Sequence, residues 1–225
     1  HRSPVGAAGG PYGSRFIAVW HKGHLLSDTI ALARSDDGGV TWSSLAELYD
    51  HSRAPSIATD GAGTWILAWR YRYGTDAEIF YTRSLDDGVT WSPPTALNTN
   101  AGSDVENDDR PRGTWANGVW AVVWTAQPTI GEQGVRSARS IDGGATWSAP
   151  VALDPPTDIL QDLSPDIATD GSGTWIVAWN KGSFGDPVDA DIYIARSVDG
   201  GASWSASAAL DVGAGTDMAE DISPT

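Results

Sequence analysis

Short apolar runs alternate with polar, glycine-rich turns along the whole chain. The runs are rich in Trp, Ile, Val and Tyr, and they end at Gly, Asp, Asn or Pro. Four of them recur at corresponding places, in residues 16–20, 65–69, 120–124 and 175–179. Runs of this kind are typical of β-strands, and no segment has the apolar period of an amphipathic helix. The pattern therefore predicts an all-β protein.

An eight-residue motif, Ser-x-Asp-x-Gly-x-Thr-Trp, occurs four times, with Ser203 in the Thr position of the last copy. In each repeat a third run, such as 78–83 or 191–196, leads into the motif, and a fourth run follows its Trp. Four short antiparallel strands per unit of roughly 50 residues are typical of a propeller blade. We therefore predict a β-propeller with four-stranded antiparallel blades, about four of them in this chain. The residues that define the motif are Asp37, Gly39, Trp42, Asp86, Gly88, Trp91, Asp142, Gly144, Trp147, Asp199, Gly201 and Trp204.

Prolines recur in phase with the motif and mark the first strand of each repeat: Pro4, Pro55, Pro111, Pro165 and Pro224. The chain is expected to be a single domain over 1–225, with blades at about 3–50, 54–100, 110–154 and 164–211. Residues 216–225 are expected to begin a further blade or a closing strand, because Ser223-Pro224 repeats Ser3-Pro4.

An open propeller would expose strand edges and apolar faces at its end blades. We therefore expect a homo-oligomer or additional blades to complete the ring. A fragment of a longer array and a redundant C-terminal tail are the alternatives.

Composition narrows the classes of partner. The chain has 14 basic and 29 acidic residues, a formal net charge of −15, which disfavours nucleic acid and anionic membranes. Neutral sugars and cations remain compatible with that charge. Hydrophobic residues make up 40% of the chain, and its 12 Trp residues support a packed core. It has no cysteine, and no apolar run is long enough to insert into a membrane.

The motif resembles the Asp-box, or bacterial neuraminidase repeat, of sialidases and related β-propellers. The resemblance implies that the motif forms the turn between the third and fourth strands of each blade, and that the protein is secreted or at the cell surface. In such a turn Asp accepts backbone hydrogen bonds, Gly supplies a positive φ, and Trp packs between adjacent sheets. Recurrence in every blade favours a structural role for these aspartates over a catalytic one.

The resemblance to sialidases also implies candidate catalytic residues. Those enzymes bind the substrate carboxylate with three arginines, the first in an Arg-Ile-Pro motif, and use a Tyr nucleophile with a Glu and an Asp acid/base. Arg2-Ser3-Pro4 and Arg53-Ala54-Pro55 share that spacing but lack the Ile. Since such sialidases have six blades, catalysis by this chain would need additional or partner blades. The candidate carboxylate-binding residues are Arg2, Arg53, Arg70 and Arg110.

A second set of candidates is acidic. Asp-x-x-x-Asp precedes three of the recurring prolines, on loops that run from the outer strand of one blade to the inner strand of the next. These carboxylates would bind sugar hydroxyls or Ca²⁺, or would only keep an acidic surface solvated. The residues are Asp104, Asp108, Asp158, Asp162, Asp217 and Asp221, and a separate cation candidate is Asp186, Asp189 and Asp191.

The connections between second and third strands add aromatic and basic residues on the same side: Arg70, Tyr71, Arg72, Tyr73 and Lys181. Such residues stack on sugars and bind hydroxyls, although an ordinary strand end has a similar composition. The sequence therefore favours a non-catalytic scaffold that binds a glycan or another small polar ligand. A sialidase-like exo-glycosidase and a structural repeat module of a larger secreted protein are the alternatives.

Overall fold

A computed structural model describes residues 6–9, 14–23, 28–73, 76–103, 105–129, 132–154, 160–183 and 190–210. Within these ranges the chain forms sixteen β-strands and no helix, which confirms the all-β prediction. Accordingly, the described part of the chain has no helix that could span a membrane. Several predicted residues lie outside these ranges, together with the expected closing strand 216–225: Arg2, Asp104, Asp158, Asp186, Asp189, Asp217 and Asp221.

The strands follow one another in four antiparallel groups of four, which we call blades 1 to 4. Blade 1 contains β1 (Gly6–Gly9), β2 (Phe16–Gly23), β3 (Asp28–Ser35) and β4 (Ala46–Asp50). Blade 2 contains β5 (Ser52–Thr59), β6 (Trp65–Tyr73), β7 (Asp76–Ser84) and β8 (Thr95–Ala96). Blade 3 contains β9 (Asn107–Ala116), β10 (Val119–Thr129), β11 (Glu132–Ser140) and β12 (Val151–Ala152). Blade 4 contains β13 (Leu160–Thr169), β14 (Trp175–Ser183), β15 (Ala190–Ser197) and β16 (Ala208–Ala209).

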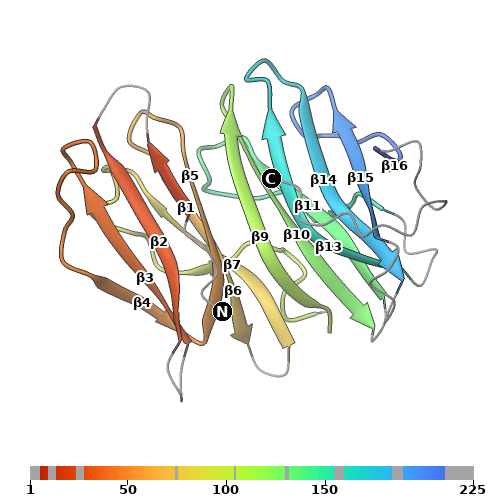
Figure 1. Cartoon of the computed structure of the whole chain (residues 1–225), viewed down its shortest axis with the longest axis horizontal. Coiled ribbons are helices and arrows are strands. Elements are labelled where there is room, and N and C mark those ends of the chain that lie inside the picture. Colours follow the sequence, from red (N-terminus) through yellow and green to blue (C-terminus); the bar gives the residue numbers. More distant parts are fainter. Residues whose placement is uncertain are drawn as a thin grey trace.

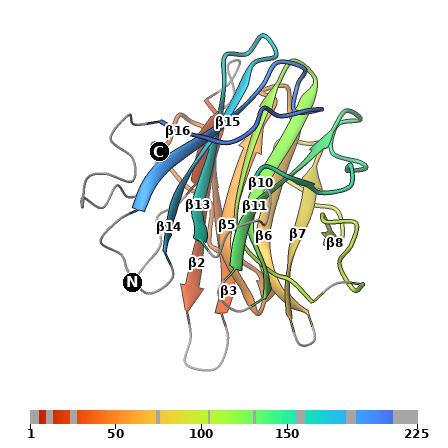
Figure 2. The ribbon, with the colours of Figure 1, turned by 90° about the vertical axis from the view of Figure 1, so that its right-hand side faces the viewer.

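The blades stand side by side in chain order, from β4 at one end of the molecule to β16 at the other (Figure 1). Their first strands adjoin one another, so β5 contacts both β1 and β9, and β9 contacts β13. Single parallel bridges, Ala77↔Asn107 and Gln133↔Gln161, link blade 2 to blade 3 and blade 3 to blade 4. Within blade 2 the strands run outward from β5 to β8 (Figure 2). This is the blade arrangement of a β-propeller.

The hydrophobic core lies between neighbouring blades, in three clusters. In the two inner blades, both faces of the second strand are covered, so 65–69 and 120–124 are buried without interruption. In blade 4 the second strand alternates instead, with Trp175 and Val177 buried and Ile176 40% exposed. The difference arises because an inner blade has a neighbour on both sides and an end blade has one.

Candidate functional site

The four motifs form the turns between third and fourth strands and share one hydrogen-bond pattern. In blade 2, Asp86 Oδ1 accepts from Thr90 N at 2.8 Å and Oδ2 accepts from Thr90 Oγ1 at 2.6 Å. The Ser84 hydroxyl bonds Asp86 Oδ1 and accepts from Gly88 N, both at 2.8 Å. These bonds lower the pKa of Asp86 to about 2. Both carboxylate oxygens therefore accept hydrogen bonds from within the turn.

The other three motifs repeat this geometry. Thr41, Thr146 and Ser203 each donate a backbone N–H and a hydroxyl to the aspartate of their own turn. The hydroxyl bond from Thr41 is the largest cause that lowers the pKa of Asp37, to about 2. The same hydrogen bonds lower the pKa values of Asp142 and Asp199.

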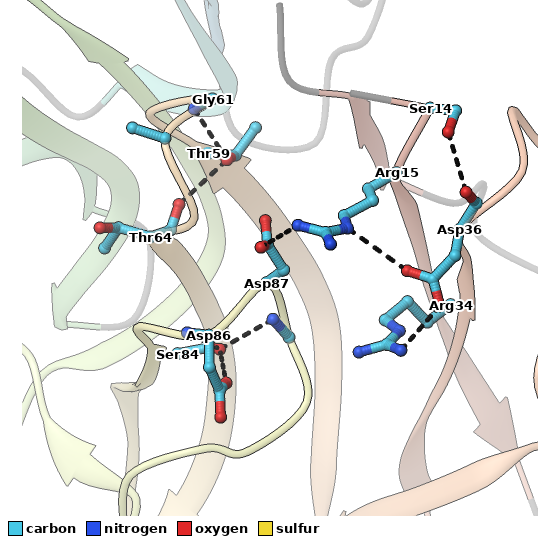
Figure 3. Close-up of polar contacts among 12 residues, drawn as sticks. Ser14, Arg15, Arg34, Asp36, Thr59, Gly61, Thr64, Ser84, Asp86 and Asp87 are labelled. Atoms are coloured by element: carbon cyan, nitrogen blue, oxygen red, sulfur yellow. Dashed lines mark hydrogen bonds and ion pairs between the residues drawn. The ribbon is translucent and has the colours of Figure 1, made fainter. Parts of the chain in front are cut away.

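An ion network that the sequence pattern did not predict joins blades 1 and 2 on the side of the motif turns (Figure 3). Arg15 Nε lies 3.5 Å from Asp36 Oδ1, and its Nη1 pairs with Asp87 of the next blade. Arg34 Nη2 reaches Asp36 Oδ2 at 2.7 Å. None of the other repeats has an arginine at the place of Arg15, so a search for periodic residues overlooks it.

The opposite ends of the blades carry the predicted binding residues, and the first strands bulge there. The register of β5, β9 and β13 shifts at the residue pair that contains the recurring proline. The residue before each proline has a positive φ: Ala54 at 48°, Arg110 at 53° and Ser164 at 52°. This conformation is unfavourable for any residue other than Gly, and also for a residue that precedes Pro. Backbone strain repeated at one position often accompanies a functional surface.

We call this side the loop face and define it by its exposed or part-exposed basic and aromatic residues, Arg53, Tyr71, Arg72 and Arg110. The Arg53 side chain is 57% exposed and pairs with Asp28 of blade 1. Arg110 Nη1 donates to Ser164 Oγ of blade 4 at 2.8 Å. Tyr71 packs on Phe80 with ring centroids 4.9 Å apart.

The predicted arginines therefore lie at successive blade junctions rather than around one shared partner. Arg53 meets Asp28 at the first junction, Arg70 Nε lies 3.8 Å from Asp109 Oδ1 at the second, and Arg110 meets Ser164 at the third. Burial raises the pKa of Asp28, but hydrogen bonds from His21 and Arg53 outweigh it and lower the pKa overall. Tyr73 ends β6, and its side chain lies outside the described part of the structure.

Two of the predicted acidic residues are buried rather than displayed to a ligand. Asp108 and Asp162 are each 2% exposed. Asp162 Oδ1 accepts from Trp179 Nε1 at 3.0 Å, and the carboxyl also bonds Asp154, which pairs with Lys181. Burial, reinforced by the negative charge of Asp154, raises the pKa of Asp162 to about 8. Lys181 is 7% exposed, so this group forms an internal contact between blades 3 and 4.

Within the described ranges, no three His, Cys, Asp or Glu residues are grouped so as to hold a metal ion. Of the separate cation candidate, Asp191 lies in β15 and is 8% exposed. Its two predicted companions fall outside the described residues, so the Ca²⁺ prediction stays untested.

No protein-family model matches the chain. Among solved structures it is similar to a protein of unknown function from Dyadobacter fermentans DSM 18053, with a TM-score of 0.70 and 17% identity over 93% of this chain and 69% of that one. It is also similar to the Hadza microbial sialidase Hz136, with a TM-score of 0.59 and 17% identity over 92% and 58% of the two chains. The α-L-arabinanase of Penicillium chrysogenum gives a TM-score of 0.65 and 19% identity over 96% and 68%.

These likenesses define the class of fold: a sialidase-like β-propeller, as the repeated motif predicted. The chain spans between 58% and 69% of the length of those three proteins. At identities of 17–19%, the fold is what the chain shares with them.

Proposed function

We propose that the chain binds a carbohydrate on its loop face without hydrolysing it. The observation that carries the proposal is that Arg53, Tyr71, Arg72 and Arg110 lie at the loop-face ends of strands in blades 2 and 3, with Arg53 and Arg110 in the bulged first strands. Guanidinium groups donate several hydrogen bonds to hydroxyl or carboxylate oxygens, and an aromatic ring stacks on the apolar face of a sugar. The similar fold of a named sialidase and a named arabinanase supports the class of ligand.

In this proposal the buried acids hold the strands in place and do not make the first contact with the sugar. Asp162 positions β13 through Trp179 and Asp154, so a sugar meets the exposed arginines before it meets this carboxyl. Because the net charge is −15, we expect a neutral or singly charged glycan rather than a polyanion. The proposal includes a secreted or cell-surface location, and a partner or further blades that complete the ring.

One observation favours a second function, a sialidase-like exo-glycosidase. Arg53, Arg70 and Arg110 belong to the same side of three successive junctions, where arginines of this kind would bind a substrate carboxylate. In this alternative the remaining catalytic groups come from additional or partner blades.

The test is a glycan array followed by calorimetry with the glycans that bind. Arg72→Ala and Tyr71→Ala are expected to weaken binding about tenfold or more, equivalent to about 1.4 kcal/mol. Arg15→Ala, an exposed arginine on the opposite side, is the matched control and should leave the affinity unchanged.

Three results would overturn the proposal. Equal affinity in the variants and the wild type would move the site away from the loop face. Hydrolysis of a fluorogenic sialoside or arabinoside, lost in Arg110→Ala, would establish the enzymatic alternative. Absence of both binding and hydrolysis in the natively assembled protein would leave a structural repeat module.

A further inference from the structure

We infer that the outward faces of blades 1 and 4 are the two halves of one blade junction, and that a second copy of this chain supplies the missing half to each. The blade 1 end face consists of Phe16, Trp20 and Trp42, and the blade 4 end face consists of Ile176 and Arg196. This inference rests on the part of the proposed function that calls for a completed ring, and its test measures assembly without any glycan.

The junction between blades 2 and 3 shows what each half contributes. The motif Trp147 of blade 3 packs edge-on against Tyr81 of blade 2, with ring centroids 5.5 Å apart. Arg83 Nη1 donates to the Gly143 carbonyl at 3.2 Å, and the Tyr81 hydroxyl donates to the Ala145 carbonyl at 3.2 Å. The turn between those carbonyls lies directly against Ile66 of blade 2. One blade thus contributes an Ile and an Arg, and the next contributes a motif turn and its Trp.

Parts of this arrangement recur at the other two junctions. Arg139 Nη1 of blade 3 donates to the carbonyls of Asp199 and Gly200 in the motif of blade 4, at 3.4 and 3.3 Å. Between blades 1 and 2, Gly88 of the motif turn lies against Ile17. Trp204 and Trp91 pack into the clusters of those two junctions, as Trp147 does into its own. Every junction therefore packs a motif Trp against the preceding blade, while the isoleucine contact occurs at two of the three junctions and the arginine contact at two.

Blade 1 carries the motif half of a fourth junction with nothing against it in the described structure. Trp42 is 44% exposed, whereas the three other motif tryptophans are partly buried in clusters with the preceding blade. Phe16 and Trp20 are partly exposed, while their equivalents Trp65 and Trp69 are 1% and 0% exposed.

Blade 4 carries the complementary half. Ile176 is 40% exposed, whereas Ile17 and Ile66 at the same position of blades 1 and 2 are 0% and 2% exposed. Arg196 is exposed at the position where Arg83 and Arg139 donate to the next motif turn. The guanidinium can donate to the carbonyls of a motif turn, and the isoleucine beside it can pack against the Trp of that motif.

A second copy fits because every copy carries both halves. The two end faces lie at opposite ends of the row of blades (Figure 1), so the motif of one copy meets the blade 4 face of another. The contact joins two different surfaces, so copies assemble head to tail into a ring or, if the rotation does not close, a filament. The carbonyls around 36–39 would accept from Arg196, and Trp42 would cover Ile176, as Arg83 bonds the blade 3 motif and Trp147 shares a cluster with Ile66 between blades 2 and 3.

The experiment measures self-association by sedimentation velocity over a range of protein concentrations. The wild type is expected to associate, and Trp42→Ala and Ile176→Asp are each expected to remain monomeric. Ile141→Asp is the matched control, because Ile141 is 71% exposed on a motif turn inside the row and should not change association. Circular dichroism and thermal melting verify that the variants are folded.

Mixing the two monomeric variants tests the head-to-tail geometry. Each variant keeps the half that the other has lost, so an equimolar mixture is expected to form a dimer with a single junction, weaker than the wild-type assembly. Monomeric wild type at all concentrations, or association unaffected by either substitution, would overturn the inference. Failure of the mixture to associate would do the same, since it would indicate an interface in which one patch pairs with itself.

Discussion

At the scale of single residues, the acidic side chains divide into exposed aspartates that hold turns and buried ones between blades. The motif aspartates are at the surface, yet their oxygens are engaged by donors of their own turn. Asp162 is buried beside another carboxyl and a lysine. The two environments shift the pKa in opposite directions, and each shift has a consequence for stability.

Replacement of a motif aspartate should destabilise the fold and weaken its response to acid. The pKa of Asp86 is about 2 in the folded protein against an ordinary 3.8, so its contribution is complete above about pH 4 and is lost as the pH falls toward 2. Asp86→Ala is expected to lower the melting temperature at pH 7 and to lose less stability than the wild type between pH 4 and 2. Thermal melting across that range is the measurement. Leu85→Ala, on the same turn and 65% exposed, should behave as the wild type.

Asp162 should make stability fall as the pH rises. Between its ordinary pKa of 3.8 and its folded pKa of about 8, the folded protein holds a proton that the unfolded chain has released. One such proton changes the free energy of unfolding by at most about 1.4 kcal/mol per pH unit. Urea denaturation between pH 5 and 9 is expected to show this decline, and Asp162→Asn should flatten it. An unchanged slope in that variant, or the same flattening in Asp166→Asn on the same strand, would contradict the assignment.

At the scale of the element, the repeated parts are the blade junction and the bulged first strand. Each junction places a motif turn of one blade against the isoleucine position, the arginine position or both in the blade before it. Each bulge places a residue with positive φ before a proline. The junctions stabilise the row of blades, and the bulges hold a strained backbone beside the proposed binding residues.

Replacing the motif tryptophan should lower the free energy of unfolding more in an inner blade than in blade 1. Trp147→Ala removes a ring packed between blades 2 and 3, and we expect a loss at the lower end of about 3–5 kcal/mol. Trp42→Ala removes the equivalent ring where no blade precedes it, and should change the free energy of unfolding by about 0.5 kcal/mol or less. Urea denaturation at concentrations where both variants are monomeric compares them. Equal losses would argue against the junctions described above.

The strained backbone at Arg110 should lower stability, while its guanidinium contributes to glycan binding. Arg110→Ala and Arg110→Gly both remove the guanidinium, so both are expected to lower the affinity for a glycan. Glycine tolerates a φ of 53°, so Arg110→Gly should be more stable than Arg110→Ala, by up to about 1 kcal/mol. Denaturation and calorimetry on the pair separate the backbone effect from the loss of the side chain. Greater stability of the Ala variant would show that the bulge is not strained.

At the scale of the whole molecule, the net charge opposes self-association and the two end faces favour it. Copies with a net charge of −15 repel one another, whereas the end faces attract through apolar contact and Arg196. Added salt screens the repulsion over a Debye length of about 10 Å at 0.1 M. Head-to-tail association is therefore expected to strengthen between about 0.02 and 0.2 M NaCl, as followed by sedimentation velocity. Weakening with salt would indicate an interface dominated by ion pairs instead.

Much of the fold was predictable from the sequence, because blades are local units. Each motif turn is stabilised by atoms only a few residues apart, such as Asp86 and Thr90, and so it leaves a fixed spacing in the sequence. Four copies of that spacing, with short apolar runs between them, predicted four-stranded antiparallel blades.

The burial of the predicted site residues was not predictable in that way. Asp108 and Asp162 stand three residues before a recurring proline and Arg110 stands immediately before one, and the spacing does not say which of these positions the rest of the fold covers. The two aspartates are each 2% exposed and Arg110 is exposed, because packing in the folded protein covers one position and leaves the other open. The Arg15 network escaped prediction for a related reason: it occurs once, and it joins groups 72 residues apart.

The sequence by itself determined the repeating unit, since the motif's hydrogen bonds and the strand pattern are local. Only the tertiary structure decided which faces of that unit are covered. Ile66 and Ile176 occupy the same place in their blades, yet one is 2% and the other 40% exposed. The physical reason is that burial depends on the neighbouring blade: an identical residue lies in the core of an inner blade and on the open face of an end blade.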